Sequence, residues 1–101
     1  MLNQTVLVGR ITENPTIKEL ESGKKVSTIT LKVPRTWKNA EGIYEDDCIP
    51  CILWSPVAEN VVEYCKKGDL VGIKGRLQVT ENKMEIVAEK VTYLSSKKED
   101  N

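Results

Sequence analysis

The residues of this sequence that could carry chemistry are two tryptophans, Trp37 and Trp54, set among lysines and arginines. Proteins use flat aromatic rings to stack nucleic-acid bases and positive side chains to follow phosphates. Histidine is missing from all 101 residues, which excludes His-based general bases, Ser/His or Cys/His nucleophiles and His-containing metal sites. Because no other catalytic constellation is present, the sequence predicts a binding protein, not an enzyme, that needs no cofactor.

Fifteen basic and fifteen acidic residues cancel, so a strong overall positive field is excluded. The local charge is less balanced. The basic residues from Lys24 to Lys38 are not interrupted by an acid, and Lys74 and Arg76 share one face of a predicted strand. The run Glu45-Asp46-Asp47 is acidic and offsets part of this positive charge. This pattern fits either a positive face on a neutral protein or a solvated surface of mixed charge.

Three cysteines, Cys48, Cys51 and Cys65, raise the question of a redox or metal site. Cys48-Ile49-Pro50-Cys51 looks like a redox pair, but that chemistry needs a helix N-terminus. In a strand, residues three apart point to opposite faces, so Cys48 and Cys51 cannot easily form a disulfide or share a metal. A structural zinc site needs four ligands, and three cysteines without histidine do not supply them. We therefore expect reduced thiols and no metal: Cys51 in the core, Cys65 on the apolar side of a helix, and Cys48 at the surface or in an interface.

Hydrophobic alternation and turn residues predict five strands, at residues 5–11, 26–33, 47–54, 69–79 and 84–94. Pro50 argues for an edge or a bulge in the third strand, and Gly72 and Gly75 for bends in the fourth. A single helix is expected after the third strand, with Ser55 as N-cap, Pro56 at its first position, and Gly68 as its stop. Residues 34–45, including Trp37, are expected to form a polar loop.

Three strands, one helix and two strands in this order predict an all-β OB-fold, a five-stranded Greek-key barrel with one helix between strands 3 and 4. A split β/α sandwich would usually need a second helix. We expect one domain over residues 1–95 and a short polar disordered tail over 96–101. The sequence shows neither a membrane-spanning run nor a signal peptide, so we expect a cytoplasmic protein without membrane contact.

Several motifs in order resemble the bacterial and phage single-stranded DNA-binding protein family. The opening MLNQTVLVGRITENP is similar to the family's first strand, and VSTITLKVPRTW to its second strand and the loop that follows. CIPCILWSPVAENVVEYCKKGDLVGIKGRL is similar to its third strand, helix and fourth strand. The similarity covers residues 1 to about 79 and resumes over Val87–Leu94. Several ordered motifs are far more specific than one short pattern.

The resemblance implies binding of single-stranded DNA with little sequence preference, in replication, recombination or repair. Trp37 and Trp54 fall where the family keeps base-stacking aromatics. The phosphate-contact candidates are the basic residues of the predicted strands and their flanks: Arg10, Lys32, Arg35, Lys74 and Arg76. The resemblance also implies a homo-oligomer, a dimer or a tetramer, formed through the first strand and an exposed sheet face.

The sequence departs from the family at three places. Cys48 stands near a point where the family usually has another aromatic, and the hairpin at Thr80–Lys83 is short and carries no aromatic. We also expect no acidic C-terminal tip of the kind by which the family's replicative members recruit replication proteins, because Ser95–Asn101 does not resemble one. These departures suit a phage, plasmid or mobile-element member, or a protein similar to primosomal replication protein N. They leave open a second function, an OB-fold protein-interaction subunit of a primosome or recombination complex, with its tryptophans in a protein interface.

Overall fold

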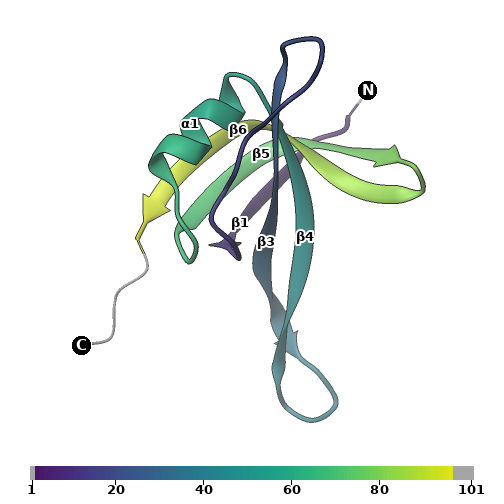
Figure 1. Ribbon diagram of the computed structural model, residues 1–101. Coiled ribbons are helices and arrows are strands. Elements are labelled where there is room, and N and C mark those ends of the chain that lie inside the picture. Colours follow the sequence, from purple (N-terminus) through teal and green to yellow (C-terminus); the bar gives the residue numbers. More distant parts are fainter. Residues whose placement is uncertain (1, 97–101) are drawn as a thin grey trace.

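The computed structural model describes residues 2–96 and shows a closed barrel from which hairpins project (Figure 1). The strands are β1 (Thr5–Ile11), β2 (Lys18–Glu19), β3 (Lys25–Lys38), β4 (Tyr44–Trp54), β5 (Leu70–Thr80) and β6 (Lys83–Ser95). Their order is β1-β5-β6-β4-β3-β2, and an additional β1–β3 pairing closes the barrel. β4 and β6 pair in parallel and the other neighbours are antiparallel. The five barrel strands confirm the OB-fold prediction.

The core lies inside the barrel and follows the predicted alternation. Ile29 and Leu31 of β3 face Cys51 and Leu53 of β4, all buried, while the residues between them point outward. The single helix, α1 (Val57–Tyr64), comes between β4 and β5, which are the third and fourth barrel strands. Its buried residues Ala58 and Val61 join the core cluster, so α1 covers one end of the barrel.

The two ends of the helix are not where the sequence placed them. Ser55 is not the N-cap, because its hydroxyl donates to the Lys25 carbonyl oxygen and accepts from the Lys25 N–H, both at 3.1 Å. Pro56 occupies the N-cap position without a side-chain cap, and the helix already ends at Tyr64. Gly68 has a φ of +91° but serves the following turn, in which its N–H donates to the Ile11 carbonyl oxygen.

The predicted loop over residues 34–45 is wrong: it is the outer part of a long β3–β4 hairpin, and Trp37 lies on β3. Cross-strand pairing continues to Lys38↔Tyr44 after a register shift between Pro34 and Lys38. Asn39 forms the turn, since its Oδ1 accepts from the N–H groups of Glu41 and Ile43. Both faces of this arm are exposed, so it lacks the apolar alternation by which a strand is recognised in a sequence.

Two of the other predicted irregularities are confirmed, at Pro50 of β4 and at Gly75 of β5, whereas Gly72 lies in regular pairing with Val8 of β1 and Thr92 of β6. β4 pairs with β6 only at Cys51 and Ile52, so Pro50 lies where β4 is an edge on that side. β5 and β6 shift register between Lys74 and Gly75, and the hairpin turns tightly at Glu81 and Asn82, both at positive φ. The two-residue β2, which is not among the five predicted strands, pairs with the start of β3.

The boundary of the polar tail stays a prediction, because residues 97–101 lie outside the described residues. Within residues 2–96, no helix combines the length and apolar character needed to cross a membrane.

Candidate nucleic-acid interface

Trp54 stands at the end of β4, on the outer face of the β3–β4 ribbon. Its neighbours on this face are Cys48, Pro50 and Ile52, and its cross-strand partner is Val26. Trp54 is 37% exposed and lines a hollow of about 350 Å³ together with Lys24 and Ser55. A tryptophan beside a lysine in an open hollow offers a stacking surface and a phosphate contact at one place.

Arg10 and Lys32 meet on the same side of the barrel, where β1 pairs with β3. They line two adjoining hollows, one of about 440 Å³ with Pro34 and Asp46, and one of about 250 Å³ with Lys67. Arg10 Nη1 donates to the Gly68 carbonyl oxygen at 2.9 Å, which holds the guanidinium against the turn before β5. Three cations therefore surround these hollows, a suitable place for phosphate oxygens.

Arg35 and Trp37 lie together on the other face of the ribbon. The guanidinium carbon of Arg35 is 5.9 Å from the centroid of the Trp37 ring, a cation–π contact. Arg35 Nη2 is 2.9 Å from Asp47 Oδ1 and its Nη1 is 3.2 Å from Glu45 Oε2. The hydrogen bonds from Arg35 lower the pKa of the Asp47 carboxyl, and the Asp47 side chain raises the pKa of Arg35.

Two more of the predicted cations are also paired with carboxylates. Lys32 Nζ is 3.6 Å from Asp46 Oδ2, and Arg76 Nη1 is 3.5 Å from Glu89 Oε2. Lys74 has no ion pair within the described part of the chain and stands opposite Lys90 on β6. Three of the five cations that the sequence selected for phosphate thus already have intramolecular partners.

The structure divides the seven predicted residues into three groups. Lys32 lies six positions along β3 from Val26, the partner of Trp54, which is about 20 Å at ~3.3 Å per residue. Trp54, Lys32 and Arg10 therefore form one track on the outer face. Arg35 and Trp37 form the second group, on the opposite face. Lys74 and Arg76 form the third, since β1 and β6 separate their strand β5 from β3 and β4.

Two residues of the outer track were missed as candidates from the sequence. Lys24 precedes β3 and Lys67 follows α1, so the fold brings two separate loops to the track. Their only sequence signal was their basic neighbours, since Lys24 begins the stretch from Lys24 to Lys38 and Lys67 follows Lys66. Together, Lys24, Trp54, Lys32, Arg10 and Lys67 form what we call the outer track.

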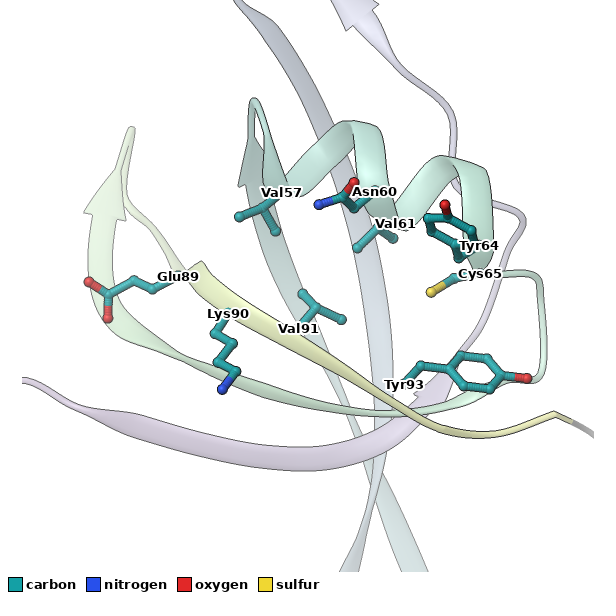
Figure 2. Close-up of a pocket in the computed structure, with 9 residues that line it drawn as sticks. All are labelled: Val57, Asn60, Val61, Tyr64, Cys65, Glu89, Lys90, Val91 and Tyr93. Carbon is teal, nitrogen blue, oxygen red and sulfur yellow. The ribbon is translucent and has the colours of Figure 1, made fainter.

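A further cavity, of about 320 Å³, lies between α1 and β6 and contains none of the predicted residues (Figure 2). Tyr64 and Tyr93 stand on its two sides, and the Cys65 thiol lies beside them. Burial and the neighbouring Asp69 raise the pKa of the Cys65 thiol. A thiol that stays protonated is a poor nucleophile and metal ligand, so this cavity has no evident catalytic use.

Cys51 and Cys48 are placed as the sequence predicted, whereas Cys65 is buried as expected but lies just after the end of α1 and not on the helix. Cys51 is fully buried and burial raises the pKa of its thiol to about 11, whereas Cys48 is exposed on the opposite face of β4. All three cysteines are free. Residues 2–96 contain no group of three or more potential metal ligands.

Comparison with known proteins agrees with this geometry. The model of the single-strand binding protein family matches residues 2–97. "Single-stranded DNA-binding protein 3" of Listeria innocua is 42% identical over 106 residues, covering 96% of this chain and 66% of the relative. "Single-stranded DNA-binding protein 1" of Clostridium acetobutylicum is 42% identical over 108 residues, covering 97% of this chain and 98% of the relative.

The relatives differ in length, and this chain spans about two thirds of several of them. It covers 69% of "Single-stranded DNA-binding protein B" of Bacillus subtilis, with 47% identity over 78 residues. Among solved structures, an SSB domain from Synechococcus sp. superimposes with a TM-score of 0.77 at 18% identity, over 92% of this chain and 97% of that one. That likeness concerns the fold alone. Together, the match to the family model over residues 2–97 and the 42–47% identity to these relatives show that the chain belongs to the single-strand binding protein family.

Proposed function

We propose that the chain binds single-stranded DNA with little sequence preference and serves as a binding module, not a catalyst. The observation that carries this proposal is the outer track, in which a hollow beside Trp54 is followed by hollows between Arg10, Lys32 and Lys67. OB-folds bind oligonucleotides on the face of their second and third barrel strands, which are β3 and β4 here. The relatives named single-stranded DNA-binding proteins support the same function. Stacking and phosphate contacts carry little base information, so sequence preference is slight.

The three groups of predicted residues take different parts in this proposal. A base stacks on Trp54, and phosphates contact Lys24, Arg10 and Lys67. A second base stacks on Trp37, where Arg35 already covers part of the ring. Lys74 and Arg76 contact the same strand only where it passes around the barrel to β5. Replication, recombination or repair in the cytoplasm would supply single-stranded DNA for these contacts.

Titration with oligo-dT at two salt concentrations, followed by tryptophan fluorescence, tests the proposal. Stacked bases are expected to quench the tryptophans. Each phosphate neutralised on a single strand contributes about −0.7 to the slope of log K against log salt. The three track cations without an ion pair within residues 2–96, Arg10, Lys24 and Lys67, give a slope near −2, and hence about a 20-fold loss between 50 and 200 mM salt. An affinity unchanged by salt, or no quenching, would contradict the proposal.

We also propose that the chain forms a homo-oligomer, a dimer or a tetramer. The outer face of β1 exposes Val6 and Val8, and Leu94 of β6 packs near Gly72 on the same sheet. Exposed apolar side chains that gather on one sheet face are typical of a subunit interface. Sedimentation equilibrium is expected to give a mass at least twice 11.4 kDa. A single species at the monomer mass would refute this part of the proposal.

A further inference from the structure

The acidic run Glu45-Asp46-Asp47 lies on β4 directly across from the cations of β3. Its residues Asp46 and Asp47 pair in register with Pro34 and Val33. Strand alternation sends Asp46 to the outer face, where it meets Lys32, and Asp47 and Glu45 to the other face, where they meet Arg35. One short run therefore neutralises a cation on each face of the ribbon.

The contacts of Arg35 use the donors that a phosphate would need. Its Nε lies 3.2 Å from both carboxylate oxygens of Asp47, its Nη2 lies 2.9 Å from Oδ1, and its Nη1 lies 3.2 Å from Glu45. A guanidinium binds carboxylate and phosphate with the same planar fork. The second oxygen of Glu45 accepts from Asn39 Nδ2 at 2.9 Å, which fixes that carboxylate in place.

These pairs are accessible to a competing anion. The side chains of Lys32 and Asp46 are 55% and 39% exposed, and that of Arg35 is 37% exposed. A single ion pair at the exposure of Lys32–Asp46 contributes little to folding stability, so stability gives little reason for Asp46. The bidentate Arg35–Asp47 pair is of the kind that does stabilise a fold, and it also occupies the guanidinium. Asp47 is a carboxylate at neutral pH in any case, and the hydrogen bonds from Arg35 lower its pKa further, so it keeps its charge to more acidic pH.

We propose that Glu45, Asp46 and Asp47 act as an internal competitor for the phosphates of single-stranded DNA and thereby set its affinity and salt dependence. This inference rests on the proposed function. A phosphate that binds Lys32 or Arg35 competes with a carboxylate for the same cation. The displaced carboxylate then recruits a cation from solution, which offsets the counterion released from the DNA. The run therefore lowers both the affinity and the steepness of its salt dependence.

The test compares the wild-type chain with the triple variant E45Q/D46N/D47N in oligo-dT titrations between 50 and 200 mM salt. We expect the variant to bind at least 10-fold more tightly at 50 mM salt. Its salt slope should be steeper by about 1.4, from two further phosphates at about 0.7 each. The single variant D46N, which frees only Lys32, should show about half of the change in slope.

A control removes negative charge away from the ribbon. Glu63 on α1 and Glu81 in the β5–β6 turn are exposed, and neither has an ion pair within residues 2–96. The variant E63Q/E81Q should bind within about twofold to threefold of the wild type. Equal tightening per charge removed in E63Q/E81Q and in E45Q/D46N/D47N would show a general charge effect and overturn the inference.

The failure of this inference can be told apart from a failure of the proposed function. If the wild type binds oligo-dT and E45Q/D46N/D47N binds no more tightly, only the inference is wrong. If neither the wild type nor any variant binds oligo-dT, the proposed function is wrong as well. Thermal unfolding of each variant shows whether the protein still folds. If the triple variant is destabilised, the oligo-dT titration of D46N decides the question, because D46N changes a single exposed side chain.

Discussion

Replacing Trp54 with alanine is expected to weaken oligo-dT binding by roughly 5- to 150-fold, the loss of one base stack worth about 1–3 kcal/mol. Trp54 provides the only aromatic ring on the outer track, and it faces an open hollow beside Lys24. Alanine leaves the charge of the track unchanged. The salt slope should therefore stay the same while the affinity falls at every salt concentration.

Two further variants make the measurement specific. Trp54→Tyr keeps a ring for stacking and should retain most of the affinity. Tyr64→Ala removes an exposed ring from α1, beside the cavity in Figure 2 and away from the outer track, and should change the affinity by less than twofold. Sedimentation of Trp54→Ala provides the contrasting result. Dissociation of an oligomer or of a partner complex, with oligo-dT affinity unchanged, would indicate that Trp54 serves a protein interface.

The barrel could be predicted from the sequence because its strands bury one face. β1 begins and ends where the sequence placed it, and the inward and outward residues of β3 and β4 follow the predicted parity. Burial against a core forces apolar and polar residues to alternate, and that alternation is visible in one sequence. The same reason explains the correct placement of Cys48 and Cys51 on opposite faces.

The β3–β4 arm could not be predicted in the same way. Its outer residues pair across strands but bury no face, so ion pairs such as Arg35–Asp47 replace apolar contacts. The helix start was wrong for a different reason. Ser55 has the right chemistry for an N-cap, but a tertiary contact with the Lys25 backbone uses its hydroxyl instead. Local sequence patterns do not show which of two partners a polar side chain will find.

The candidate site was predicted in its parts but not in its assembly. Trp54 and Lys32 lie on the predicted face of their ribbon, yet Arg10 joins them only through the β1–β3 pairing that closes the barrel. Lys24 and Lys67 reach the outer track from loops that are more than forty residues apart. The carboxylate partners of Lys32, Arg35 and Arg76 also depend on strand register. Strand registers and barrel closure depend on residues that are far apart in the sequence, so composition and spacing could not predict them.

Replacing Gly75 with alanine is expected to lower the free energy of unfolding by about 3 kcal/mol or more, the upper range for overpacked sites. A Cβ atom at Gly75 would lie 2.1 Å from the carbonyl oxygen of Val87 and 3.0 Å from its carbonyl carbon. These are backbone atoms of the neighbouring strand β6, so no side-chain rotation relieves the clash. The strands would have to separate at the register shift between Lys74 and Gly75, where the barrel bends.

Gly72→Ala is the matched control, because the sequence predicted the same bending role for both glycines of β5. A Cβ atom at Gly72 would have its nearest neighbours at 3.9–4.0 Å, in Leu7, Leu94 and Thr92, which is ordinary van der Waals contact. Its alanine variant should unfold within about 1 kcal/mol of the wild type, since glycine inside a strand is itself unfavourable. Thermal unfolding should separate the two variants by about 10 °C or more at this chain length. Equal melting temperatures would mean that β6 can move away from Gly75 at little cost, and that the bend at this position does not depend on glycine.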